Sequence, residues 1–159
     1  MMSAETTIAI VEDELVATRF WAKRHNLKLA WLPESLEIRC VLTQPNTGNQ
    51  FFLHADVENY KEEPPAWTFR GSNWEEGTNR HDYPGQIVGA PGSTIFHNKG
   101  VLCAPFNRLA FKRNGGPHGD WGTPAQWMSA QGNYVQAHTI GDMLAVIYRD
   151  FQYSTGRLA

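Results

Sequence analysis

The chain has 159 residues, of which 42% are hydrophobic and 19% charged, and these values are typical of one globular domain covering residues 1–159. The formal net charge is −2 and the basic residues form no cluster larger than short pairs, so the charge distribution is not that of a nucleic-acid-binding protein. The first residues lack the basic and apolar regions of a secretion signal, and no apolar run approaches the length of a membrane span, so we expect a cytoplasmic protein with no membrane partner.

Residues 8–25 carry apolar side chains at the spacing of an amphipathic helix, with acidic residues early and basic residues late, as the helix dipole favours. Asn26 is the expected stop. The apolar stripe is formed by Ile8, Val11, Leu15, Val16, Phe20 and Ala22. Arg19, Lys23 and Arg24 lie on the exposed face, which is either simply solvated or able to bind an acidic partner.

Three strand-like segments follow the helix, and a short fourth comes after a di-proline corner. They are residues 27–32, 36–42, 51–57 and 66–70. Cys40 points the same way as the leucines of its segment, so we expect it in the core. A helix followed by an antiparallel four-stranded meander is the element order of an α+β fold rather than of βαβ units.

The second half of the chain is predicted to contain long loops and one further helix. Residues 71–92 are rich in Gly, Asn, Asp and Pro, which indicates a surface loop. Thr139 is a predicted N-cap, and the apolar spacing after it predicts a closing helix that runs to about Tyr153. Residues 154–159 are expected to fray.

The chain has 2 cysteines, and Cys103 is the one whose neighbours suggest chemistry. It lies between Gly100, which permits a tight turn, and Pro105, which cannot donate to a sheet ladder. We therefore expect an irregular, exposed path, where a thiol is a candidate nucleophile. The alternative is a small buried side chain with no chemical role.

Three polar residues precede this cysteine: His97, Asn98 and Lys99. A cation such as Lys99 favours the thiolate form of a nearby cysteine. Amide and imidazole groups such as those of Asn98 and His97 can stabilise an oxyanion or move a proton. These residue types suit acyl transfer through sulfur, although each of them is also common in ordinary turns.

Four short motifs occur in order along the chain. They are Tyr60 with Pro64-Pro65 and Phe69, then Gly100-Val-Leu-Cys103, then Trp121, then His138-Thr-Ile140. This series resembles the ubiquitin-conjugating enzyme (UBC) family, and the resemblance runs from the first helix to the closing helix. The sequence departs from the family pattern in the short spacing of His97-Asn98 to the cysteine, in the long insert at residues 107–120, and in having one helix after it. These features look more like the compact bacterial members.

The resemblance implies a UBC-like fold with an active-site loop around Cys103. In that family the cysteine takes the C-terminal acyl group of a ubiquitin-like protein from a ubiquitin-activating-like enzyme, and passes it from a thioester to an amine of an acceptor protein. Here Asn98 would be the oxyanion donor, and His97 would orient the turn or act as a base. Compact bacterial members are implicated in antiphage defence, which is the biological role that the resemblance implies.

Two further sets of residues are candidates for roles in the reaction that the resemblance implies. His118 and Asp120, in the Gly-rich insert, are candidates to accept the proton of the incoming amine, with simple turn formation as the alternative. The basic residues Arg19, Lys23 and Arg24 match the face on which family members meet the activating enzyme.

Other classes of function stay open. A hydrolase would pair Cys103 with His118 or His138 and would need a third group to orient the imidazole. A non-catalytic UBC-like module would only bind a ubiquitin-like protein. A zinc site from His97, Cys103 and His118 has a spacing that matches none of the common patterns, so we expect no metal and no cofactor.

Overall fold

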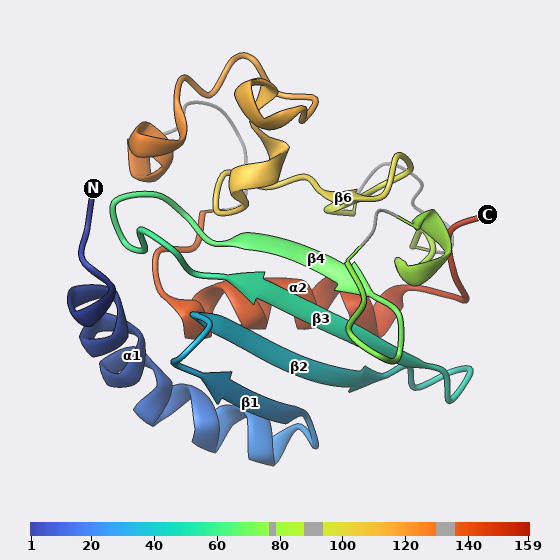
Figure 1. Ribbon diagram of the computed structural model, residues 1–159. Coiled ribbons are helices and arrows are strands. Elements are labelled where there is room, and N and C mark those ends of the chain that lie inside the picture. The colour runs from blue at the N-terminus through green and yellow to red at the C-terminus, as the bar shows by residue number, and fades with distance from the viewer. Residues whose placement is uncertain (77–78, 88–93, 130–135) are drawn as a thin grey trace.

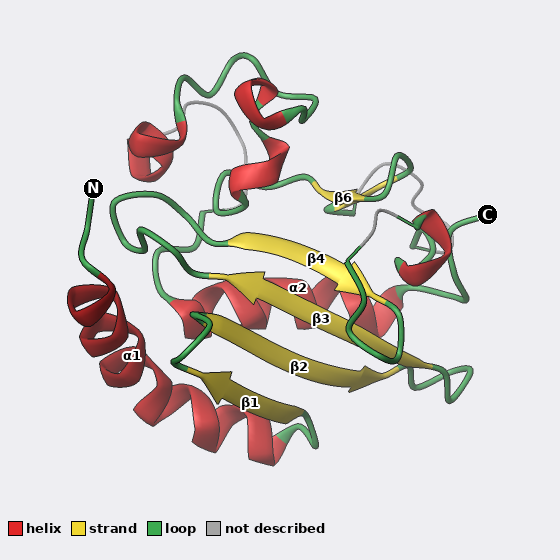
Figure 2. Ribbon diagram, viewed as in Figure 1, coloured by secondary structure: helices red, strands yellow, loops and turns green. Residues whose placement is uncertain are grey.

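The computed structural model describes residues 1–76, 79–87, 94–129 and 136–159. It consists of an N-terminal helix, a four-stranded antiparallel sheet, an irregular segment that carries Cys103, and a C-terminal helix (Figure 1). The C-terminal helix crosses one face of the sheet, and the N-terminal helix runs along the edge formed by the first strand (Figure 2). The predicted α+β class and the order of these elements are therefore confirmed.

Helix α1 spans Ala4–Arg24 and ends near Asn26, which has a positive φ of 57°. The predicted start at residue 8 is wrong, because Ser3 caps the helix by accepting a hydrogen bond from the Thr6 N–H at 3.2 Å. Part of the predicted apolar stripe is also wrong: Val16 is 60% exposed and Phe20 is 71% exposed. The buried positions of the helix are Thr7, Val11, Leu15, Thr18 and Ala22.

The sheet has the order β1-β2-β3-β4, with neighbouring strands antiparallel throughout. The strands are β1 (Lys28–Leu32), β2 (Glu37–Thr43), β3 (Gln50–Asp56) and β4 (Ala66–Arg70). Cys40 is fully buried between β1 and β3, as its alternation with polar residues predicts. Burial raises the pKa of its thiol to about 12, so this cysteine is an inert core residue.

One face of the sheet forms the core with helix α2, which spans Ile140–Tyr153. The Phe51 ring meets the Phe151 ring edge to face, with centroids 5.3 Å apart. Thr139 caps the helix as predicted, because its Oγ1 accepts from the Asp142 N–H at 3.1 Å. No helix in the described part of the chain combines the length and the apolar character needed to cross a membrane.

A single carboxylate joins both helices to the corner that precedes β4. Glu14 of α1 accepts hydrogen bonds from the Tyr60 hydroxyl at 2.7 Å and from the first backbone N–H of α2, at Ile140, at 2.9 Å. Its other oxygen pairs with Lys61 at 2.9 Å. A negative charge at a helix N-terminus is stabilising, so Glu14 fixes the start of α2 against the rest of the fold.

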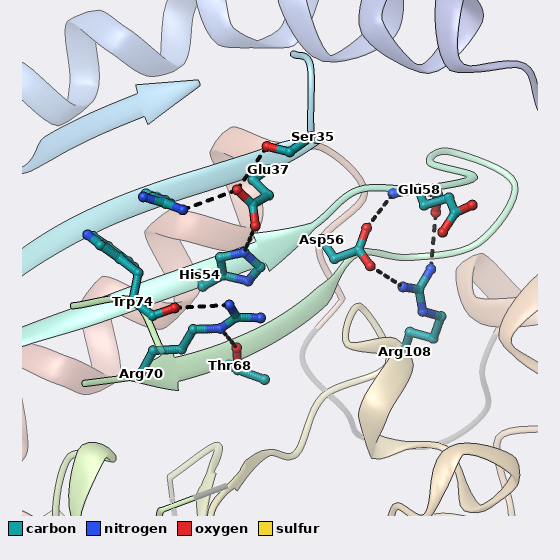
Figure 3. Close-up of polar contacts among 10 residues, drawn as sticks. Ser35, Glu37, His54, Asp56, Glu58, Thr68, Arg70, Trp74 and Arg108 are labelled. Carbon is teal, nitrogen blue, oxygen red and sulfur yellow. Dashed lines mark hydrogen bonds and ion pairs between the residues drawn. The ribbon is translucent and has the colours of Figure 1, made fainter. Parts of the chain in front are cut away.

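The other face of the sheet is polar and partly covered by the segment after β4 (Figure 3). His54, which is 2% exposed, contacts the Glu37 carboxylate through Nε2 at 2.9 Å. Arg70 donates to the Trp74 carbonyl at 3.3 Å, and the Trp74 ring meets Phe52 edge to face. Figure 3 also shows Arg108, which donates to the carboxylate of Asp56 at 3.3 Å and so ties the segment after Cys103 to the end of β3.

The C-terminal tail is packed, so the expectation that residues 154–159 fray is wrong. Ser154 is fully buried and its hydroxyl accepts from the Gln44 amide at 2.9 Å. Leu158 is 5% exposed and its N–H donates to the Tyr83 carbonyl at 3.0 Å. Contacts with residues more than 70 positions away, which no local pattern encodes, therefore hold the tail.

Most described residues between 71 and 82 are exposed, as the predicted surface loop requires, but residues 83–85 of that range are buried. Within its described part, Tyr83 is only 2% exposed and packs edge to face on Phe69. Gly85 approaches the backbone of Thr155 so closely that an added Cβ would lie 2.2 Å from the Thr155 carbonyl oxygen. Residues 88–93 of the predicted loop lie outside the described residues, as do residues 77–78.

Candidate active site

Cys103 lies at the open end of a short β-hairpin. Strands β5 (Phe96–His97) and β6 (Val101–Leu102) pair antiparallel, and the Cys103 N–H extends the ladder by donating to the Ile95 carbonyl at 2.7 Å. The chain then leaves the hairpin, and the cysteine is half-buried. Its backbone is thus held in register while the residue stays partly exposed.

Asn107 is a buried residue that fixes the segment after the cysteine, and the sequence analysis did not single it out. Its amide donates to the Leu102 carbonyl at 2.8 Å, and its Oδ1 accepts from the Trp67 N–H at 2.9 Å and the Leu109 N–H at 3.2 Å. It therefore joins β6 to β4 and caps the 3₁₀ turn η2, Arg108–Ala110. The sequence could indicate only that Asn107 is a suitable capping residue. Its contact with β4 could not be predicted, because it depends on the fold.

A backbone ladder delivers His118 to the cysteine. The His118 N–H donates to the Ala110 carbonyl at 3.0 Å, and the His118 carbonyl accepts from the Lys112 N–H at 2.7 Å. Between these residues the chain turns at Gly115, which has a φ of 84°. Gly116 lies against Ala110, where an added Cβ would come within 2.2 Å of the carbonyl carbon. The two glycines are therefore needed for the shape of this loop.

The side chains of Cys103, His118 and Asp120 form a linear arrangement. Cys103 Sγ lies 2.6 Å from His118 Nε2, and His118 Nδ1 lies 3.2 Å from Asp120 Oδ1. An ionised carboxylate only accepts hydrogen bonds, so the tautomer of neutral His118 that fits this contact has its hydrogen on Nδ1, which donates a hydrogen bond to Asp120. The lone pair of Nε2 then faces the sulfur, which is the relationship of a general base to a nucleophile.

The electrostatics of the resting site favour the neutral thiol. Burial, and to a smaller extent the negative charge of Asp120, raises the pKa of Cys103 to about 11. The sequence-based expectation that Lys99 lowers this pKa is therefore wrong; Lys99 is exposed at the hairpin turn. A thiol in this state needs a base at the moment of attack, and His118 is the base in contact with it.

The other residues proposed upstream of the cysteine lie along the hairpin. His97 pairs with Val101, and its pKa is lowered by burial and then by the charges of Lys99 and His118. Asn98 is exposed in the turn, at the closed end of the hairpin, whereas Cys103 is at its open end. Two cross-strand pairs lie between them, so the hairpin does not bring Asn98 to the sulfur.

His138, the other possible partner of the cysteine, lies elsewhere. Its Nε2 contacts the Gln136 side chain at 3.3 Å, and its ring meets Trp127 edge to face at 5.7 Å. The structure thus brings His118 and not His138 to Cys103.

The basic residues of α1 lie on an exposed surface. Arg19, Lys23 and Arg24 are all exposed, and the first two line a depression of about 450 Å³ between the end of α1 and the start of β1. Val16 and Phe20, one turn apart on the same helix, add exposed apolar area beside them. This combination of cations and apolar side chains is suited to contact with another protein.

Comparison of the chain with family models, with curated proteins and with solved structures finds no match. In the described residues, no group of three or more His, Cys, Asp or Glu side chains is placed to hold a metal ion. The chemistry of the site therefore has to be inferred from its own residues and from the order of the elements around it.

Proposed function

We propose that this protein is a ubiquitin-conjugating-like transferase, which carries a ubiquitin-like protein as a thioester on Cys103 and transfers it to an amine. The observation that carries the proposal is the 2.6 Å contact between Cys103 Sγ and His118 Nε2, with Asp120 on the far side of the imidazole. The order of helix, meander, cysteine segment and helix, which the structure shares with the sequence resemblance, supports a UBC-like fold.

The first step is attack of Cys103 on the thioester that links the ubiquitin-like protein to the activating enzyme. The proton of the thiol passes to Nε2 of His118 while Sγ forms a bond to the acyl carbon. The bond from that carbon to the activating enzyme's sulfur breaks, and the imidazolium returns its proton to the departing thiolate. Asp120 stabilises the imidazolium between these events and keeps the ring oriented.

The second step is aminolysis of the new thioester. The acceptor amine forms a C–N bond to the acyl carbon, and its proton passes to Nε2 of His118. The C–S bond to Cys103 breaks, and the thiolate takes that proton to restore the neutral thiol. The same imidazole therefore serves both steps, which leaves His97 outside the chemistry proposed here.

The activating enzyme is proposed to dock on the exposed surface of α1 formed by Arg19, Lys23 and Arg24. An acidic partner surface would be attracted to these cations, while Val16 and Phe20 would supply the apolar part of the contact. We also propose the cytoplasmic location that the sequence analysis expects, and a role in antiphage defence, which only the resemblance implies.

The experiment that tests this function reconstitutes the reaction. The protein is mixed with ATP, an activating-type enzyme and a ubiquitin-like protein, and adducts are followed by intact mass and on non-reducing gels. We expect a thiol-sensitive adduct of one modifier in the wild type and in Cys40→Ala, the matched thiol deletion, and none in Cys103→Ala. Absence of the wild-type adduct with demonstrably active partners would rule out the transferase and leave the non-catalytic binding module or the hydrolase.

A cysteine hydrolase is the second candidate, because one observation favours it. Asp120 is the third group that orients the imidazole, and the sequence alone did not identify one for the pair of Cys103 and His118. In a hydrolase, water replaces the amine in the second step. Catalytic turnover of a small thioester by the protein alone, abolished by Cys103→Ala, would support the hydrolase; a stable acyl-Cys103 that turns over only with an amine would support the transferase.

A further inference from the structure

The solvent-facing side of α1 has a line of exposed side chains, which we call the seam: Asp13, Val16, Phe20 and Lys23. Val16 is 60% exposed and Phe20 is 71% exposed. Successive seam residues are three or four positions apart, which is the spacing that keeps side chains along one side of an α-helix. The residues of α1 that pack in the core, such as Leu15, lie on roughly the opposite side. Because α1 lies at the periphery of the molecule (Figure 1), the seam is open to another protein.

Charge is segregated along α1. Residues 4–14 carry acidic side chains and no basic one, whereas residues 15–24 carry basic side chains and no acidic one. The seam has the same order, because Asp13 precedes the apolar pair of Val16 and Phe20, and Lys23 follows that pair. A uniformly acidic or uniformly basic partner would be attracted to one half of the helix and repelled by the other. A partner that fits both halves must carry the reverse order of charges.

A second copy of α1 that runs antiparallel to the first has this reverse order by symmetry. In the register that places Val16 of each helix opposite Phe20 of the other, Asp13 of each helix faces Lys23 of the other. Glu12, beside the seam, then faces Arg24 of the second copy. The two-fold axis repeats every contact, so ion pairs flank a central apolar contact on both sides. In a parallel pair, like charges and like ends of the helix dipoles would lie side by side.

We propose that this protein forms a reversible homodimer in solution, in which the seams of two α1 helices pack antiparallel across a two-fold axis. Helix α1 has 21 residues and is about 32 Å long, so the contact consists of one pair of helices. An interface of that size is at the low end for specific complexes, so we expect a Kd of about 10–100 µM. The dimer does not depend on any chemistry of Cys103.

The seam overlaps the basic surface to which the activating enzyme is proposed to bind, since Lys23 belongs to both. Dimerisation and docking would therefore exclude each other, and this consequence alone rests on the proposed function. At a fixed ratio of activating enzyme to protein, the fraction of Cys103 adduct should fall as the wild-type concentration passes the Kd. The fraction should stay level in Asp13→Lys, which changes no basic residue of the docking surface. A wild-type fraction that also stays level would contradict the exclusion.

The test of the dimer is sedimentation of the full chain over a series of concentrations. The chain is kept under reducing agent, so that no disulfide links two copies, and is measured from about 1 to 500 µM. We expect the average mass of the wild type to rise from that of one chain towards that of two. Association should weaken between about 50 mM and 500 mM NaCl, because exposed ion pairs are screened by salt.

Charge exchange at exposed positions tests the register. Asp13→Lys and Lys23→Asp each place like charges opposite each other in the dimer, and each should raise the Kd at least about tenfold. An equimolar mixture of these two variants should associate as the wild type does, because each Lys at position 13 then faces an Asp at position 23. The double variant should likewise recover the wild-type Kd. Phe20→Ala should weaken association at any salt concentration, because it removes the apolar contact.

A matched control separates the seam from general charge effects. Glu58→Lys is a charge reversal at an exposed position outside α1, and it should leave the Kd unchanged. A mass of one chain at every concentration of the wild type would overturn the proposal. So would association that persists in Asp13→Lys and Phe20→Ala, or a mixture of the charge variants that fails to associate. None of these measurements involves acylation, so a failure of the dimer is distinguishable from a failure of the proposed function.

Discussion

The indole of Trp121 stacks on the imidazole of His118, with ring centroids 3.7 Å apart and planes within 6° of parallel. Trp121 is only 3% exposed, and its ring also meets Phe111 edge to face at 5.5 Å. The stack restricts rotation of the imidazole about its Cβ–Cγ bond, so Nε2 remains directed at Cys103. Trp121 is therefore a positioning residue for the base, in addition to its part in the core.

Truncation of this indole tests that role. We expect Trp121→Ala to lower the free energy of unfolding by about 3–5 kcal/mol and to slow acylation of Cys103 strongly. Trp121→Phe keeps an aromatic face against His118 and should recover most of the acylation rate. The acylation rates of the two variants are compared under conditions in which the same fraction of each is folded. If the role of Trp121 is purely structural, these two rates should be equal.

Asp120 is expected to have opposite effects on two properties of the cysteine. Its charge raises the pKa of Cys103, so Asp120→Asn should lower the midpoint of the pH profile for iodoacetamide alkylation. The same change removes the carboxylate that orients and stabilises the imidazolium, so acyl transfer to an amine should slow by about 10²-fold or more. Alkylation and transfer that fall together would argue against this division of roles.

The sheet and the closing helix were predictable because local patterns encode them. The alternation of apolar residues placed each strand within about two residues, and the bounds of β4 match the prediction. The start of α1 was missed because its cap, Ser3, precedes the apolar pattern. Val16 and Phe20 have apolar side chains at helical spacing, but nothing in the sequence marks their side of α1 as exposed.

The composition of the candidate site was partly predictable, and its arrangement was not. Cys103, His118 and Asp120 each stood out as residue types with suitable neighbours. Their contact depends on the backbone ladder that pairs residues 110–112 with residues 116–118, and on a glycine that fits against Ala110. Such pairing inside an irregular loop has no periodicity, so the sequence could not indicate that His118 rather than His138 reaches the sulfur.

Stability at high pH is expected to depend on the buried thiol of Cys40. Its pKa is raised from 9.0 to about 12 in the folded protein, so the fold favours the neutral thiol. The contribution of this thiol to stability is therefore fully present below about pH 9 and is lost as the pH rises towards 12. From about pH 9 to pH 11 the free energy of unfolding should fall by about 2–3 kcal/mol on this account. Cys40→Ala should show a shallower decline, whatever its stability at neutral pH.

Two buried tyrosines limit the pH range in which the effect of Cys40 on stability can be measured separately. Burial raises the pKa of Tyr83 from 10.0 to about 12, and burial together with Glu14 raises the pKa of Tyr60. Both therefore also destabilise the fold as the pH rises, but only above about pH 10. Denaturant titrations between about pH 8 and pH 10 therefore measure the contribution of the thiols to the free energy of unfolding without that of the tyrosines. If the free energy of unfolding of Cys40→Ala falls with pH as steeply as that of the wild type over that interval, Cys40 is not the group responsible.

Asp150 is expected to position Cys103 indirectly, through the backbone of Ile95. This residue of α2 is 4% exposed, and its carboxylate accepts from the Ile95 N–H at 2.9 Å. The Ile95 carbonyl in turn accepts from the Cys103 N–H. Asp150→Leu should cost about 1–3 kcal/mol of stability and slow acylation, whereas Asp150→Asn retains an acceptor and should restore the rate. Rates that follow stability alone in both variants would limit Asp150 to a structural role.

Gly116 is the residue on which the delivery of His118 depends most directly. An added Cβ would lie 2.2 Å from the Ala110 carbonyl carbon and 2.3 Å from the Leu109 carbonyl oxygen, and both of these atoms are backbone atoms that cannot move aside cheaply. Gly116→Ala must therefore displace the turn and break the bond from the His118 N–H to the Ala110 carbonyl. We expect a loss of about 1–3 kcal/mol of stability.

The effect of Gly116→Ala on the chemistry should exceed its effect on the fold. With the imidazole displaced, the thiol loses its base, so acylation should slow by about 10²-fold or more at neutral pH. The rate should then recover as the pH approaches the raised pKa of the thiol, because hydroxide replaces the base. Gly48→Ala is the matched control, since Gly48 also has a positive φ but has no atom within 4 Å of an added Cβ. That control should lose some stability from its φ and keep the wild-type pH profile, and an equal change in both profiles would show that His118 is not the base.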